Sequence, residues 1–187
     1  MLTGGPGAGK TAVLEVVQRQ FPPRVAVLPE AASIVFGGGF PRRTTHLGKR
    51  ASQRAIFHVQ RELETLVNDD NETDMVVCDR GTLDGLAYWP GDAEDFFREL
   101  GTSRDEELRR YAMVIHLRTP TADGGYNHRN PLRTESAEDA ARIDATIHGI
   151  WAAHPRRIVI ESSSAFVEKV ENVLQVLRKE LAHLSGE

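Results

Sequence analysis

The chain has one cysteine among its 187 residues, which excludes an internal disulfide. Its apolar runs are only a few residues long, so we expect no membrane-spanning helix. The chain has no basic segment followed by an apolar one, so we expect no secretory leader. Acidic residues outnumber basic residues by 27 to 23, and the net charge of −4 argues against general nucleic-acid binding. These absences favour a cytoplasmic protein in which Cys78 is a buried, reduced thiol.

Motifs of several enzyme classes are also missing. The seven histidines show no H-x-x-x-H spacing and there is no C-x-x-C pair, so a zinc site is not expected. No serine-hydrolase signature is present. We expect one α/β domain over residues 1–187, because this length suits a single core and no repeat or linker divides it. The sequence does not indicate the oligomeric state.

A glycine-rich motif of the form G-x-x-x-x-G-K-[ST] opens the chain. Its members are Gly4, Gly5, Pro6, Gly7, Ala8, Gly9, Lys10 and Thr11. Small residues let backbone N–H groups wrap a phosphate, and the helix that follows directs its positive end at the same anion. Lys10 can reach the β- and γ-phosphates, and the Thr11 hydroxyl can bind Mg²⁺. The alternative is a glycine-rich turn before an ordinary helix, but every fixed position matches, so we predict a nucleotide site.

Only Met1, Leu2 and Thr3 precede this loop. A P-loop normally follows a buried strand of about five or six residues. A shorter central strand would leave backbone groups of its neighbours unpaired, at about 1–3 kcal/mol each. Either the strand is a stub, or the natural chain starts upstream with an apolar, β-branched stretch, and we expect the second.

Two carboxylates follow strand-like apolar runs. Glu30 comes just after residues 24–28, and Asp79 comes directly after residues 75–78. The carboxyl ends of parallel strands form the ligand-binding edge of an open α/β sheet, so we expect both near the P-loop. Asp79 is the candidate Mg²⁺ ligand, and Glu30 is the candidate base for an acceptor hydroxyl. The alternatives are a structural cap for Asp79 and a solvated loop carboxylate for Glu30.

A segment rich in turn residues, 121–134, shows no hydrophobic periodicity. Loops of this length in a compact domain are typically lids or disordered, and we predict a lid over about 119–135. The segment carries Arg129 and Arg133, whose guanidinium groups suit phosphate. Either arginine alone fits an ordinary surface position, whereas two of them in a lid favour a catalytic role.

Two helical segments complete the prediction. An amphipathic helix is predicted over residues 45–68. Its core face should hold Ile56, Val59, Leu63 and Leu66. Its first turns carry Lys49, Arg50 and Arg54. These cations either form a solvated face or line the entrance for an anionic acceptor. Residues 92–110 are acidic and helical, and we expect them to face solvent.

Four motifs in order resemble those of a known family. They are residues 4–11, Glu30, the run Asp79-Arg80-Gly81 through Tyr88, and residues 126–135 before a helix. With these, nearly the whole chain resembles the AAA-type P-loop family that groups nicotinamide riboside kinase-like domains with the TRPL translocation defect protein.

The resemblance implies a three-layer α/β/α P-loop NTPase fold that is nucleoside-kinase-like and has a lid. Its parallel sheet would have five strands in the order 2-3-1-4-5, with ATP or GTP on the P-loop. It also implies Glu30 and Asp79 as an acidic pair, and Arg129 and Arg133 as lid arginines.

Three functions fit these motifs. A small-molecule kinase would transfer the γ-phosphoryl group of ATP to a hydroxyl of a nucleoside-like or metabolite acceptor, using Lys10, Mg²⁺, the acidic pair and the lid arginines. A nucleotide-dependent switch would hydrolyse slowly without an acceptor, but N-K-x-D is absent. A ring-forming AAA+ ATPase would need Asp-Glu where this chain has Asp79-Arg80. We favour the kinase.

Overall fold

A computed structural model describes residues 1–70, 73–120, 136–162 and 166–186. Five short parallel strands form its centre: β1 (Leu2–Thr3), β2 (Val25–Leu28), β3 (Met75–Cys78), β4 (Val114–Leu117) and β5 (Arg157–Ile160). They form two sheets, one ordered β1-β4-β5 and one containing β2 and β3. A single bridge between Leu2 and Asp79 joins the two sheets.

The prediction of one continuous five-stranded sheet is therefore wrong for the described residues. The cause is the length of β1, which pairs with β4 at both of its residues but meets β3 at one bridge only. The strand ends where the P-loop begins, because Gly4 has a φ of 142° and a Cβ there would lie 2.1 Å from the Leu117 carbonyl oxygen. A cavity of about 720 Å³ lies beside Met1, Val76 and Met113.

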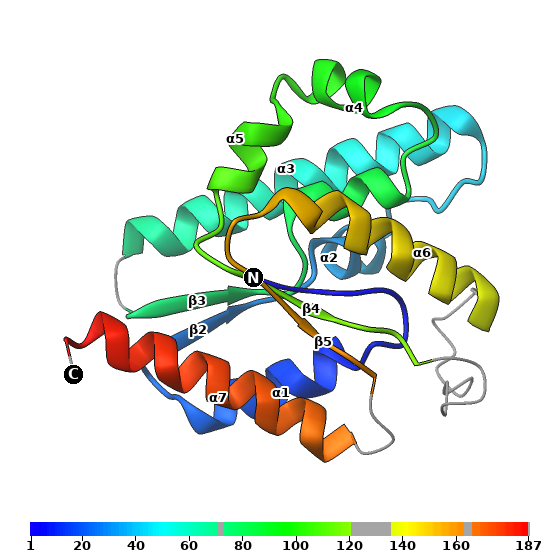
Figure 1. Ribbon diagram of the computed structural model, residues 1–187. Coiled ribbons are helices and arrows are strands. Elements are labelled where there is room, and N and C mark those ends of the chain that lie inside the picture. The colour runs from blue at the N-terminus through cyan, green and yellow to red at the C-terminus, as the bar shows by residue number, and fades with distance from the viewer. Residues whose placement is uncertain (71–72, 121–135, 163–165, 187) are drawn as a thin grey trace.

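Helices cover both faces of the strands (Figure 1). The helices are α1 (Lys10–Gln20), α2 (Ala31–Gly37), α3 (His46–Asp70), η1 (Thr82–Ala87), α4 (Ala93–Leu100), α5 (Arg104–Arg109), α6 (Ala137–Ile150), η3 (Trp151–Ala153) and α7 (Phe166–Leu184). Helices α1 and α7 lie on one face, and α3 and α6 lie on the other. No helix within the described ranges combines the length and apolar character needed to cross a membrane.

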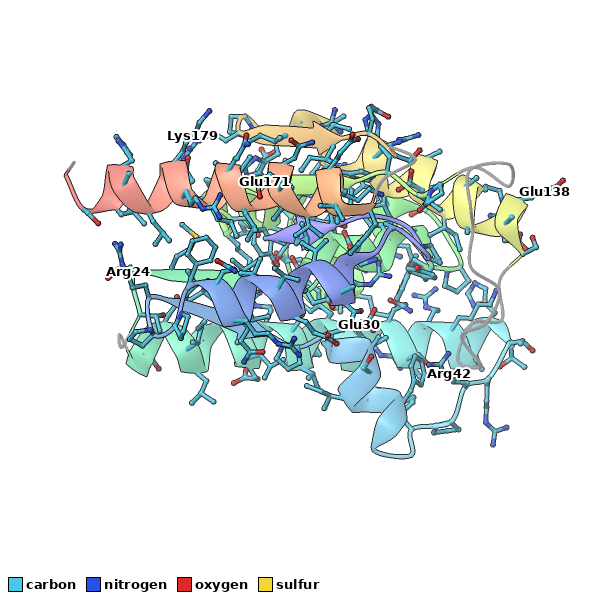
Figure 2. The ribbon with its side chains drawn as sticks, turned by 90° about the horizontal axis from the view of Figure 1, so that it is seen from below. Arg24, Glu30, Arg42, Glu138, Glu171 and Lys179 are labelled. Atoms are coloured by element: carbon cyan, nitrogen blue, oxygen red, sulfur yellow. The ribbon has the colours of Figure 1, made fainter. Side chains whose placement is uncertain are left out.

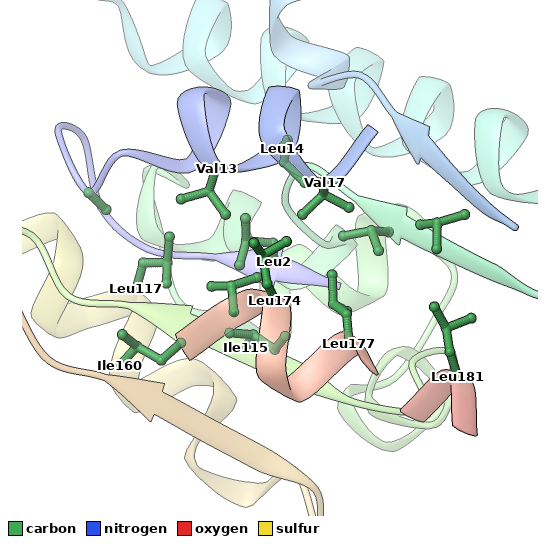
Figure 3. Packing of buried hydrophobic residues seen from close by; sticks show 14 residues of the cluster. Leu2, Val13, Leu14, Val17, Ile115, Leu117, Ile160, Leu174, Leu177 and Leu181 are labelled. Carbon is green, nitrogen blue, oxygen red and sulfur yellow. The ribbon is translucent and has the colours of Figure 1, made fainter. Parts of the chain in front are cut away.

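The main core lies between the strands and helices α1 and α7 (Figure 3). Its buried side chains include Leu2, Val13, Val17, Ile115, Leu117 and Leu174. The apolar positions of α1 and α7 recur every three or four residues, so each helix turns one stripe to the sheet. This burial anchors the start of α1, and with it the P-loop, on the central strands.

The buried face of α3 is more polar than its sequence pattern predicts. Leu66, assigned to the core, is 63% exposed, whereas Gln53, Gln60 and Glu64 are buried. Glu64 accepts hydrogen bonds from the Tyr111 hydroxyl at 2.7 Å and from the Gln60 amide at 2.8 Å. Gln60 and Glu64 are tolerated at buried positions because each has a hydrogen-bond partner.

Residues 92–110 are also more buried than predicted. Phe96 and Leu100 of α4 enter an aromatic cluster with Phe57 and Trp89. Glu107 of α5 is buried and accepts a hydrogen bond from the Thr82 hydroxyl at 2.7 Å. This segment therefore supports η1, the turn that follows Asp79, from behind.

The core position of Leu117 predicts a large effect of truncation. Leu117→Ala should lower the free energy of unfolding by about 2–5 kcal/mol, because Leu117 is fully buried between the strands and α1. Urea unfolding measures this. The matched change Leu66→Ala, at an exposed position, should stay within about 0.5 kcal/mol of the parent. Equal losses for both variants would contradict the described core.

Candidate active site

The P-loop occupies the turn between β1 and α1. Gly9 precedes the helix with a φ of 91°, a conformation that favours glycine. Gly5 is required for space, since a Cβ would lie 2.6 Å from both the Asp144 Cβ and the Thr119 hydroxyl. The buried Lys10 ammonium turns back and donates to the carbonyl oxygens of Gly4 at 2.8 Å and Gly5 at 3.1 Å. The loop therefore has the shape, and the cation, of a phosphate site.

A buried carboxylate on α6 holds the P-loop from outside. Asp144 is 2% exposed, and its Oδ1 accepts a hydrogen bond from the Gly5 N–H at 2.9 Å. The same oxygen lies 2.9 Å from Nε2 of His116 on β4, and Oδ2 lies 3.2 Å from Nε of Arg118. Burial opposes ionisation of Asp144, but the hydrogen bonds from His116 and Gly5 lower its pKa. Because Asp144 is then a carboxylate, Nε2 of His116 carries the hydrogen.

Two further side chains fix the other end of the loop. The Thr119 hydroxyl donates to the Pro6 carbonyl at 3.1 Å. The Lys169 ammonium of α7 donates to the carbonyls of Ala8 at 3.2 Å and Arg118 at 2.9 Å. Three elements distant in sequence thus preorganise the loop, which lowers the entropy that must be lost when a phosphate binds.

The predicted acidic pair lies at the carboxyl ends of β2 and β3, as expected. Glu30 precedes α2 and is paired with Arg80, whose Nε lies 2.6 Å from Oε1. The Ser33 hydroxyl donates to the other oxygen at 2.6 Å. Burial raises the pKa of Glu30, but the Arg80 charge and the Ser33 hydrogen bond outweigh this and lower it to about 2. Glu30 is therefore ionised at neutral pH.

Asp79 differs from Glu30 in having a free oxygen. It is 7% exposed, and its Oδ1 is buried without a hydrogen-bond partner among the described residues. Burial raises the pKa of Asp79, and the charges of Lys10 and Arg80 only partly oppose this. A buried carboxylate oxygen without a partner is costly unless a cation or donor is bound. This oxygen and the Thr11 hydroxyl fit a Mg²⁺ ion that takes its other ligands from phosphate and water.

No group of three or more His, Cys, Asp or Glu side chains in the described ranges could hold a metal by itself. Mg²⁺ usually binds through one or two carboxylates together with substrate phosphates, so a site that needs the nucleotide is consistent with this. Arg129 and Arg133, the predicted lid arginines, lie outside the described residues.

One cavity of about 830 Å³ joins these groups. Its wall includes Pro6, Gly7, Lys10, Thr11, Glu30, Asp79 and Arg80. It continues past the P-loop into a space that we call the acceptor chamber, bounded by α2, residues 38–45, α3 and η1. The chamber is lined by Phe36, Arg42, Lys49, Gln53, Phe57 and Tyr88. In Figure 2, Glu30 lies near the middle of the molecule, between Arg24 and Arg42.

Several residues of this site are not predicted from the sequence. Arg80 lies inside a motif without a role of its own, and His116 has no ligand-type spacing to other histidines that would single it out. Asp144 had a usable signal, because it lies four residues after Ala140 and three before Ile147, on the apolar stripe of α6. A charged residue at such a position is buried, and a buried charge needs partners.

A family described as an AAA domain matches residues 1–169. The chain belongs to this family. Membership agrees with the resemblance carried by the P-loop, Glu30 and the Asp79-Arg80-Gly81 run. No curated protein matches the chain.

Among solved structures, the chain is similar to thymidylate kinase from Candida albicans. The TM-score is 0.68 at 12% identity, over 97% of this chain and 91% of the other. At this identity the likeness establishes the fold alone, an α/β P-loop kinase fold. The chain therefore belongs to an AAA-domain family and has a P-loop kinase fold.

The contact between Asp144 and the P-loop predicts a loss of nucleotide affinity on its removal. Asp144→Ala should weaken ATP binding about tenfold or more, since hydrogen bonds to a charged group contribute about 1.5–3 kcal/mol. Isothermal titration calorimetry measures the affinity. Glu138→Ala, at an exposed position on the same helix, should bind ATP as the parent does. Unchanged affinity in folded Asp144→Ala protein would show that Asp144 does not position the loop.

The environment of Lys10 predicts proton uptake on nucleotide binding. Burial and the Arg80 charge lower the pKa of Lys10 to about 8, so near pH 8 about half of the free protein has a neutral Lys10. A phosphate anion favours the charged amine, so ATP binding should take up protons near pH 8 and few at pH 6.5. Calorimetry in buffers of different ionisation enthalpy counts them. Asp79→Asn should retain the uptake, whereas its loss would assign the proton to Asp79.

Proposed function

We propose that the protein is an ATP-dependent small-molecule kinase. One observation carries the proposal: the P-loop and both carboxylates line a cavity that extends beyond the nucleotide site into the acceptor chamber. A nucleotide switch has no need of such a chamber, whereas a kinase must hold a second substrate against the γ-phosphate. On this view residues 1–187 are one P-loop kinase domain, with residues 119–135 as its lid.

The P-loop supplies the nucleotide site. Backbone N–H groups of the P-loop from Gly7 onward would bind the β- and γ-phosphates, and Lys10 would exchange its carbonyl partners for phosphate oxygens. Thr11 and Asp79 would hold Mg²⁺, which neutralises charge on the phosphates when bound. ATP is the expected donor, with GTP as the alternative.

Glu30 faces the acceptor hydroxyl. In the transfer, the acceptor oxygen forms a bond to the γ-phosphorus, the bond from that phosphorus to the bridging oxygen breaks, and ADP leaves. The hydroxyl proton passes to Glu30. A pKa of about 2 makes Glu30 a weak base, but phosphoryl transfer depends mainly on positioning and charge stabilisation. Glu30 is accordingly an orienting acceptor for the hydroxyl more than a strong base.

The lid arginines complete the proposal. Arg129 and Arg133 would close on the transferred phosphoryl group and stabilise its charge. The likeness to a thymidylate kinase supports a nucleoside-like acceptor. A screen for phosphotransfer with ATP and GTP against nucleosides and hydroxylated metabolites, with Lys10→Ala as the blank, tests the whole proposal. Nucleotide hydrolysis with no phosphorylated acceptor would favour the switch.

ATP–Mg²⁺ should raise the melting temperature, and Lys10→Ala should abolish most of the increase. A ligand at one hundred times its dissociation constant stabilises the folded state by about 2.7 kcal/mol. Differential scanning fluorimetry at millimolar nucleotide measures the shift. Lys179→Ala, in the last turns of α7 and outside the cavity wall, is the matched control. No shift in the parent protein would remove the basis of the proposal.

The two carboxylates should separate in mutant kinetics. Glu30→Gln should lower kcat by about 100-fold and leave ATP affinity nearly intact. This loss is at the lower end of the range typical for removal of a general base. Asp79→Asn should instead weaken the dependence of ATP affinity on Mg²⁺. Steady-state kinetics and a Mg²⁺ titration distinguish the two. Equal effects of both changes on ATP affinity would contradict this division of roles.

A further inference from the structure

The charges of the cavity are unevenly distributed. Its carboxylates among the described residues are Glu30, Asp79 and Asp84. All three interact electrostatically with Lys10, which places them at the P-loop end. Asp84 belongs to η1, but its oxygens accept hydrogen bonds from Thr3 and Trp151. None of the side chains named above as lining the acceptor chamber is a carboxylate, although the chain as a whole is net acidic. The chamber is therefore a region of positive potential inside a negatively charged protein.

Three cations line this chamber without an ion-pair partner in the described parts of the chain: Arg42, Arg43 and Lys49. Arg42 stacks on the Phe36 ring, with its guanidinium carbon 4.1 Å from the ring centroid. This contact holds the charged group against the wall. Solvated surface cations need no ligand, but these three reach one cavity from two successive segments.

Neighbouring cations on α3 show the contrast. The sequence placed Arg50 and Arg54 with Lys49 as entrance residues. In the structure Arg50 is paired with Asp95 at 2.6 Å, and both arginines are paired with Glu99 of α4. Neither lines the cavity. Of these three cations, Arg50 and Arg54 are thus directed to α4, and the unpaired Lys49 is directed to the chamber.

A buried amide gives a second, independent observation. Gln53 is 9% exposed and lines the chamber, and its side chain has no hydrogen-bond partner among the described residues. Gln60, two turns further along α3, donates a hydrogen bond from its amide nitrogen to Glu64. The Gln53 amide carries one acceptor and two donors at the cavity wall, so a ligand with both a donor and an acceptor on one edge can pair with it. Phe36 and Phe57 supply apolar surface for a flat ring beside it.

We infer that the acceptor is an anion: a planar ring with a hydrogen-bonding edge that also carries a phosphate or a carboxylate. The ring edge binds Gln53, and the anionic group binds Arg42, Arg43 and Lys49. The hydroxyl that receives the phosphoryl group faces Glu30. This inference rests on the proposed kinase function for the role of the ligand, though not for its binding.

Matched pairs of candidate acceptors test the inference. Nucleosides against their 5′-monophosphates vary a phosphate, and uridine against orotidine varies a ring carboxylate. The anionic member of at least one pair should have a kcat/KM at least tenfold higher, and the pair that responds identifies the group. Equal kcat/KM values in both pairs would overturn the inference while leaving the kinase proposal standing.

Binding measurements keep the two proposals separate. With ADP saturating the P-loop, calorimetry should give an affinity at least tenfold higher for the anionic member, whether or not phosphate is transferred. Phosphoryl transfer to none of these compounds, with this preference retained, would count against the kinase alone. Equal affinities, or no binding of any member, would count against the anionic acceptor.

Variants assign the effect to the named side chains. The double change Arg43→Gln and Lys49→Gln should reduce the preference for the anionic member about tenfold without changing the affinity for ATP. Gln53→Leu should weaken both members of a pair equally. Arg19→Gln, at an exposed cation on α1 with no ion pair among the described residues, is the control. A preference that survives the double change would overturn the assignment.

Discussion

The Arg80 guanidinium holds the site together. Its Nε binds Glu30 at 2.6 Å, and its Nη1 lies 3.3 Å from the Gly4 carbonyl oxygen and 3.5 Å from Asp84. One side chain thus connects the end of β2, the P-loop and η1. Its backbone has a φ of 74°, which costs about 1–3 kcal/mol for a residue with a side chain. The strained turn aims Asp79 into the cavity while Arg80 neutralises Glu30.

Local patterns in the sequence were sufficient to predict two strands and the P-loop. Strands β2 and β3 lie on the two apolar runs that precede Glu30 and Asp79, and helix α1 follows the P-loop directly. Cys78 is buried as predicted, and burial raises its pKa to about 12. The family could be predicted because its motifs, such as the P-loop and the Asp79-Arg80-Gly81 run, are contiguous in the sequence.

Other parts of the molecule could not be predicted from local patterns. The polar side of α3 is buried because Tyr111 and Arg110, distant in sequence, provide partners for Glu64. Helix α2 has only seven residues, too few for a clear period. The link between Asp144 and Gly5 spans 139 residues, so only the folded chain reveals it. Tertiary hydrogen bonds, which no local pattern encodes, decided the cases of Glu64 and Asp144.

The unpaired cations of the acceptor chamber have a consequence for the speed of encounter. The field of exposed charges decays over about 8 Å at physiological ionic strength. Within that distance, Arg42, Arg43 and Lys49 attract an approaching anion, although the net charge of the protein is negative. Collisions at the chamber mouth are thereby favoured over collisions elsewhere. Low salt should strengthen this electrostatic steering, and high salt should screen it.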